Sequence, residues 1–237
     1  MIRASRMAQF SAPHLAALAA LCLLCAGAVV IGRRLPGPPT EALRLALAGV
    51  ILAAWLGEYA ADVIRGTWSA RYDLPLQLTD AVSVVSVLAL VTRRRALVEL
   101  TWFWAMSASL QATVTPDLSR TFPSVYYFTY FGYHDGAVAA ALLLVVGCGI
   151  YPRRGRAVRA FALAAGWAAL AGVADLILDA NYMYLRSAPA HSSLLALLGP
   201  WPWYVLGGAA IGLLMVVALD WVAAALRRRD RRFNLLG

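Results

Sequence analysis

Residues 74–80 read Leu74-Pro75-Leu76-Gln77-Leu78-Thr79-Asp80 and open an apolar segment that runs on to Val91. This stretch carries an amide, a hydroxyl and a carboxylate into what we predict to be a membrane helix. Polar and ionisable groups are costly at lipid depth, so each one there is expected to have a partner or a function. We therefore expect the functional part of the molecule to be arranged around the start of this helix.

The composition of the whole chain predicts a membrane protein. Of its 237 residues, 62% are hydrophobic and 14% are charged, and the mean hydropathy is +0.69. Soluble domains carry about 25% charged residues. No long polar linker divides the chain, so we predict a single all-α domain over residues 1–237, a polytopic transmembrane helix bundle. The net charge of +9 lies in short loops, which argues against nucleic-acid binding because no soluble basic surface is present to carry it.

The chain contains seven apolar segments, each close to the roughly 20 residues that cross a bilayer. The predicted spans are residues 12–31, 42–63, 74–91, 97–114, 126–150, 158–178 and 201–226. The first segment also has features of a signal peptide, since Arg3 and Arg6 precede its apolar core. We favour its retention as a span, because the apolar run is long and Arg33-Arg34 follow it as a stop.

The arginines orient this seven-transmembrane bundle. Most of the 21 basic residues fall at alternate span ends, which places those ends in the cytoplasm. These arginines are Arg33, Arg34, Arg44, Arg93, Arg94, Arg95, Arg153, Arg154, Arg156, Arg159 and the C-terminal run that begins at Arg227. We therefore predict an N-terminus outside and a cytoplasmic C-terminus, in the cell (inner/plasma) membrane.

The loops on the opposite, outer side carry nearly all of the unusual sequence. Besides residues 74–80, they contain Gln111-Ala112-Thr113-Val114-Thr115-Pro116-Asp117-Leu118, the segment Asn181-Tyr182-Met183-Tyr184-Leu185 and the segment Gly199-Pro200-Trp201-Pro202-Trp203-Tyr204. Together with His134, these stretches resemble the YwaF-like integral membrane proteins of bacteria. That resemblance implies a relation to eukaryotic membrane phospholipid acyltransferases and, more distantly, to androgen-induced membrane hydrolases.

The resemblance also implies which residues react. The acyltransferase branch implies a Cys/His pair, which falls here on Thr79 and His134. A threonine in place of the cysteine does not fit thiol chemistry. The androgen-induced membrane hydrolases, however, are similar in pairing a threonine with a histidine. The resemblance thus implies acyl-chain chemistry with Thr79 as nucleophile and His134 as base.

Considered on their own, these residues also allow structural roles. Thr79, Ser83 and Ser86 share one helical face, and such hydroxyls often bond to the preceding turn or join neighbouring helices. His134 has the alternative of an interfacial histidine among tyrosines. Asp80 must be protonated, paired or hydrated at its depth.

Supporting or substrate-positioning roles are expected for a second set of polar residues in the outer segments. An aspartate after a proline often caps or orients a turn, which is our preferred role for Asp117. Asn181 and Tyr182 are candidates either for positioning a lipid headgroup or for closing a turn. The complete set is Gln77, Asp80, Gln111, Asp117, Asp135, Asn181 and Tyr182. Neither the histidines nor the cysteines have metal-ligand spacing, so we predict no metal and no cofactor.

Three classes of function remain open. The first is a membrane-embedded acyl-chain transferase or hydrolase that acts on a lipid ester, such as a lysolipid or acyl ester, through a Thr79/His134 pair at the outer face. The second is a binding or transport protein for a small solute or lipid, with an outward-facing polar cavity and no catalysis. The third is a structural membrane protein with a polar core.

Overall fold

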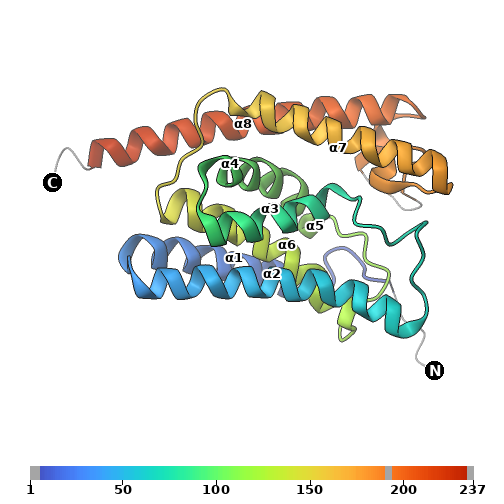
Figure 1. Ribbon diagram of the computed structural model, residues 1–237, viewed down its shortest axis with the longest axis horizontal. Helices are drawn as coiled ribbons and strands as arrows, with labels where there is room; N and C mark the ends of the chain where they lie inside the picture. Colours follow the sequence, from blue (N-terminus) through green and yellow to red (C-terminus); the bar gives the residue numbers. More distant parts are fainter. Residues whose placement is uncertain (1–5, 190–193, 234–237) are drawn as a thin grey trace.

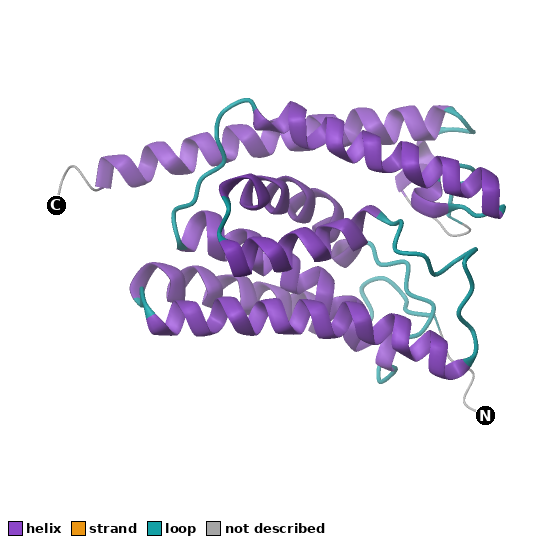
Figure 2. Ribbon diagram, viewed as in Figure 1, coloured by secondary structure: helices purple, strands orange, loops and turns teal. Residues whose placement is uncertain are grey.

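The computed structural model describes residues 6–189 and 194–233, and these residues form helices joined by loops and turns (Figure 2). Two residues of the sequence interpretation, Arg3 and His191, lie outside the described residues. The prediction of an all-α fold is confirmed over the part of the chain that is described.

Seven helical segments follow one another in the described residues. Two of them continue through π-helical turns: α4 passes through η1 into α5, and α6 passes into η2. In chain order the elements are α1 (Ala12–Arg34), α2 (Pro38–Arg65), α3 (Leu78–Thr92), α4 (Arg95–Trp104), η1 (Ala105–Ser109), α5 (Leu110–Val114), α6 (Val125–Leu142), η2 (Leu143–Gly147), α7 (Arg156–Leu178), η3 (Tyr182–Tyr184), η4 (Leu194–Leu198) and α8 (Trp203–Phe233).

Five of these segments are long and apolar enough to cross a membrane. They are Ala12–Arg34, Pro38–Arg65, Val125–Gly147, Arg156–Leu178 and Trp203–Asp230, and Leu78–Thr92 is a shorter apolar helix. Their outer faces carry large apolar side chains; Leu176 and Ile177 on α7, for example, are 78% and 76% exposed. Such a surface is suited to lipid and not to water. The chain is therefore a polytopic integral membrane protein.

Helix α6 lies at the centre of the bundle. In its most apolar window 72% of the residues are buried, compared with 11–22% in the other four long spans. In Figure 1, α1 and α2 lie on one side of the middle layer that holds α3 to α6, and α7 pairs with α8 on the other side. Gly136 allows the close contact between α6 and α2, since a Cβ atom there would lie 2.7 Å from Cγ1 of Ile51.

Two predicted helix starts need correction. The third span begins at Leu78 and not at Leu74, because Gln77 and Asp80 form a capping box that starts the helix at this point. Thr79 and Asp80 consequently lie in the first turn of α3, instead of five or six residues inside the span. The last helix begins at Trp203 and not at Trp201, after a turn that contains Pro202.

The loops gather at two ends of the bundle. At the end where the C-terminus emerges, Nη2 of Arg33 in α1 lies 3.0 Å from Oδ1 of Asp230 in α8 (Figure 1). At the opposite end, the hydroxyl of Tyr182 accepts a hydrogen bond of 2.8 Å from the backbone N–H of Leu74. The unusual outer segments therefore meet at one end, above the start of α3.

Candidate functional site

Asp80 is held rigidly in the first turn of α3. Its Oδ1 accepts hydrogen bonds from Nε1 of Trp55 at 2.9 Å and from the hydroxyl of Tyr59 at 2.8 Å. Its Oδ2 accepts from the backbone N–H of Gln77 at 2.8 Å. This buried carboxylate therefore has the partners that its depth requires, and it ties α2 to the start of α3.

The two partners on α2 were missed from the sequence. Trp55 and Tyr59 are one helical turn apart, so their side chains share a face of α2. Their spacing was a usable signal, because two polar aromatic groups on one face of a membrane helix need an acceptor.

Thr79 lies beside Asp80 on the inward face of α3. Its carbonyl accepts a hydrogen bond from Oγ of Ser83 at 3.0 Å, whereas its own hydroxyl has no hydrogen bond to any described residue. Ser83 and Ser86, which follow on the same face, are fully buried. This hydroxyl-bearing face belongs to a helix that packs against α6 and η1, so Thr79 stands at the half-buried outer edge of a polar strip that leads into the bundle.

His134 is buried in the central helix α6, with 2% of its surface exposed. Its ring lies between those of Tyr130 and Tyr133, with centroid distances of 4.4 and 4.3 Å. Nδ1 of His134 has no hydrogen-bond partner among the described residues. Buried polar atoms in folded proteins nearly always have a partner, so an unpaired imidazole nitrogen marks a place where a ligand or water is expected.

Two of the other buried polar atoms without a partner belong to helices that pack against α6. Oε2 of Glu58 on α2 and Oγ of Ser86 on α3 are buried and lack a hydrogen bond to the described residues. With His134, they come from three helices that pack on one another. Glu58 is the addition that the structure makes to the predicted site.

Gln77 connects α3 to the loop that contains η3. Its Oε1 accepts a hydrogen bond of 2.9 Å from the backbone N–H of Met183. Its carbonyl and that of Leu76 accept from Nε1 of Trp167 on α7, at 3.3 and 3.1 Å. Nε2 of Gln77, two residues before Thr79 in the chain, has no hydrogen-bond partner among the described residues.

Tyr182 holds together the loop that precedes α3 and the loop that follows α7. Besides accepting from Leu74, its hydroxyl donates to the carbonyl of Ala70 at 2.8 Å, and its backbone N–H donates to Oδ1 of Asp175 at 2.7 Å. Burial raises the pKa of Tyr182, which keeps the hydroxyl protonated as a donor. The loop that precedes α3 is thereby fastened to the end of α7.

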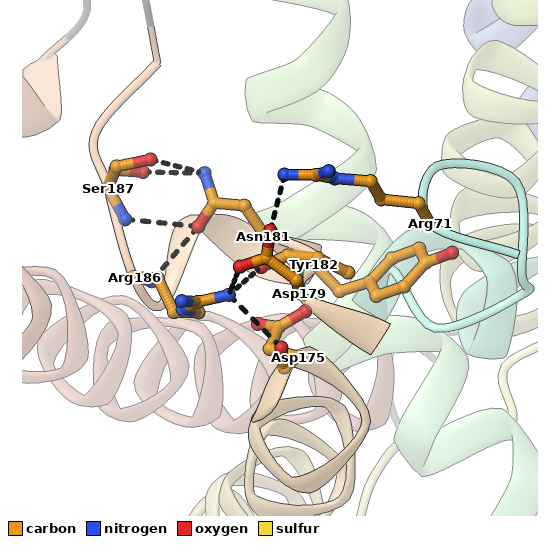
Figure 3. A network of polar contacts seen from close by, with 8 residues as sticks. Arg71, Asp175, Asp179, Asn181, Tyr182, Arg186 and Ser187 are labelled. Carbon is orange, nitrogen blue, oxygen red and sulfur yellow. Dashed lines mark hydrogen bonds and ion pairs between the residues drawn. The ribbon is translucent and has the colours of Figure 1, made fainter. Parts of the chain in front are cut away.

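Asn181 closes a turn in the same region (Figure 3). Its Nδ2 donates to the carbonyl and the hydroxyl of Ser187, both at 2.9 Å. Beside it, Asp179 forms ion pairs of 2.8 Å with both Arg71 and Arg186. Of the two roles considered for Asn181, its contacts are those of a turn residue.

Gln111 and Asp135 have partners around α5. Nε2 of Gln111 donates to Oγ1 of Thr115 at 2.6 Å, one helical turn away. Oδ1 of Asp135 accepts from Oγ1 of Thr113 at 2.8 Å. Both contacts fasten the end of α5, and the second one joins it to α6.

Asp117 lies in the loop after α5. It forms an ion pair with Arg6 and accepts a hydrogen bond of 2.6 Å from the hydroxyl of Tyr184. It therefore joins the N-terminal segment to the outer loop that contains η3. No carboxylate of the described residues donates to or accepts from Nδ1 of His134.

Comparison with known proteins identifies the family. The model of the TMEM164 family matches residues 9–220, and the chain belongs to this family. The resemblance to the YwaF-like proteins was therefore wrong: it rested on motifs of a few residues each, whereas this match extends over most of the chain. No curated protein and no solved structure matches the chain.

Proposed function

We propose that this TMEM164-family membrane protein is an enzyme that moves or hydrolyses the acyl chain of a lipid ester, with Thr79 as nucleophile and His134 as general base. The observation that carries the proposal is the fully buried imidazole of His134 with an unpaired Nδ1. It lies in α6, which is one of the helices that pack against α3.

A threonine hydroxyl is a weak nucleophile until a base removes its proton. In the proposed reaction, Oγ1 of Thr79 attacks the ester carbonyl carbon while His134 accepts the hydroxyl proton. The ester bond then breaks, the proton passes to the departing alcohol, and the acyl chain remains on Thr79. Water or a second lipid hydroxyl, deprotonated by His134, releases the acyl chain as an acid or a new ester.

The groups around Thr79 support this chemistry in different ways. The free amide nitrogen of Gln77 is a donor for the oxyanion that forms at the carbonyl oxygen. Asp80 acts by position, because all of its hydrogen bonds serve to fix the first turn of α3. We do not propose that Asp80 or Asp117 orients the imidazole of His134, because both carboxylates form hydrogen bonds or ion pairs with other groups.

A second candidate function is the binding or transport of a small solute or lipid without catalysis. The buried, unpaired Oε2 of Glu58 favours it, because that carboxylate has no part in the hydroxyl–imidazole pair. Ligand-dependent thermal stabilisation without turnover would support this alternative.

The experiment is turnover of ester-linked phospholipids by the purified protein in nanodiscs. Thr79→Val removes the hydroxyl at constant shape, and we expect activity to fall by about 10³-fold or more with the fold intact. His134→Ala should lose a similar factor, and the double variant should be little worse than either single one. Thr79→Cys should keep part of the activity.

Thr92→Val provides the matched control at the other end of α3, where the hydroxyl donates to the carbonyl of Leu88. It should leave turnover unchanged. Full activity in Thr79→Val would make Thr79 a helix-packing residue and would end the catalytic proposal.

The proposed orientation places the site at the outer face of the plasma membrane and the arginine-rich end in the cytoplasm. A reporter protein that is active only in the cytoplasm should be active when it is fused after Gly237. Activity of a periplasm-dependent reporter at the same position would reverse the orientation.

A further inference from the structure

A pocket lies at the opposite end of the bundle from Thr79, where α4 and α7 begin. Its apolar lining, called its floor below, includes Leu100, Ala160 and Leu163, and Arg156 and Arg159 line it as well. Leu163 is partly exposed on the outer face of α7, so the floor continues onto the lipid-facing surface. The pocket thus combines an apolar path with a cationic end.

The single carboxylate in this pocket is already neutralised. Glu99 is buried and accepts hydrogen bonds from Nε, Nη2 and the backbone N–H of Arg153, at 2.7, 3.1 and 3.1 Å. Nε of Arg156 lies 4.0 Å from Oε2 of Glu99. Arg159 is exposed and has no hydrogen bond or ion pair with the described residues. Because Arg153, which does not line the pocket, neutralises Glu99, Arg156 and Arg159 leave the pocket lining positively charged.

We propose that this pocket binds one phospholipid with an anionic headgroup. Its phosphate contacts Arg159 and Arg156, and an acyl chain lies along Leu100 and Leu163. Guanidinium groups pair well with phosphate oxygens, and positive side chains close to a membrane surface attract anionic lipids.

Two features of the pocket select this class of ligand. A zwitterionic headgroup brings an ammonium group, for which the pocket has no free acceptor because Glu99 is bound to Arg153. A free phosphate would leave the apolar floor without a partner, whereas an acyl chain covers it. The proposal does not depend on the chemistry at Thr79, which lies at the other end of the bundle.

The test compares retention of phosphatidylglycerol and phosphatidylcholine with identical acyl chains, by native mass spectrometry of the full chain released from detergent. The native protein should retain phosphatidylglycerol preferentially. Removing one cation near the surface should weaken binding about fivefold, so Arg159→Gln should lower retention by that factor. Since Arg159 is exposed and unpaired among the described residues, the variant should keep the melting temperature of the native protein.

Arg154→Gln is the matched control: it removes the same charge from an exposed position just before α7 that does not line the pocket. It should change retention by less than about twofold. Equal losses in Arg159→Gln and Arg154→Gln would mean diffuse attraction to the surface and would overturn the proposal. Equal retention of the two lipids would overturn it as well. So would displacement of phosphatidylglycerol by an equal concentration of glycerol 3-phosphate, which would identify a site for free phosphate.

Discussion

Tyr182→Phe separates a structural role of Tyr182 from a role in substrate binding. The phenolic oxygen is part of a side chain with 1% exposure and makes two hydrogen bonds of 2.8 Å, one to the N–H of Leu74 and one to the carbonyl of Ala70. Removing it leaves the N–H of Leu74 and the carbonyl of Ala70, both part-buried, without this partner. A fully buried polar group that loses its partner costs about 1–3 kcal/mol and a part-buried one costs less, so for the two groups together we expect the free energy of unfolding to fall by about 2–4 kcal/mol.

For a chain of this length, that loss corresponds to a melting temperature lower by roughly 5–15 °C. Thermal unfolding of the detergent-purified protein measures this shift, and hydrogen exchange at the amide of Leu74 should become faster. Tyr72→Phe is the matched control, because the Tyr72 side chain is 69% exposed and its hydroxyl has no hydrogen bond to the described residues. A Tyr182→Phe protein that melts like the Tyr72→Phe protein, yet has lost turnover, would refute the structural role and place the hydroxyl on the substrate.

Two further predictions concern helix packing and acid stability. Gly32→Ala places a Cβ 2.7 Å from Cα of Gly147, so we expect α1 and η2 to separate at a cost of about 1–3 kcal/mol, seen as a lower melting temperature. Gly27→Ala, with nothing within 4 Å of the new Cβ, should not lower it, and equal effects of the two variants would contradict this reasoning. The hydrogen bond from Arg186 is the main cause of the lowered pKa of Asp179. The ionised carboxylate therefore stabilises the fold above its ordinary pKa of about 4, and this stabilisation is lost as the pH falls through the lowered pKa. Asp179→Asn should therefore show a smaller drop in melting temperature between about pH 6 and pH 3 than the native protein, and an equal drop would exclude this contribution.

The sequence predicted the number and order of the helical segments, because each apolar run of about 20 residues corresponds to one helix. It misplaced the start of α3 for a specific reason. Leu74, Pro75 and Leu76 are as apolar as the helix that follows, so hydropathy alone assigns them to the span. The helix begins only at the capping box of Gln77 and Asp80, whose effect depends on backbone geometry.

The depth of His134 was not predictable from the sequence. All seven segments are apolar, so hydropathy does not distinguish a helix that faces lipid from α6, which is surrounded by the others. The tyrosines before His134 suggested the membrane interface, but several of them pack inside the bundle. The partners of Asp80 lie more than 20 residues earlier in the chain, and only the packing of α2 on α3 brings them together.

The distribution of hydrogen bonds around α3 separates its structural residues from its candidate reactive ones. Asp80 is bound to α2, Gln77 to the loop that contains η3, and the preceding loop to Tyr182. Each of these three connections is made by hydrogen bonds, and together they fix the first turn of α3 from three directions. A purely structural polar core would satisfy the remaining buried groups in the same way. Nδ1 of His134 is instead one of several buried atoms without a hydrogen-bond partner among the described residues, and the hydroxyl of Thr79 has no partner there either, on the turn that these three connections hold in place. Fixed surroundings with free reactive atoms are the arrangement that catalysis requires, because the cost of positioning is met before the substrate binds.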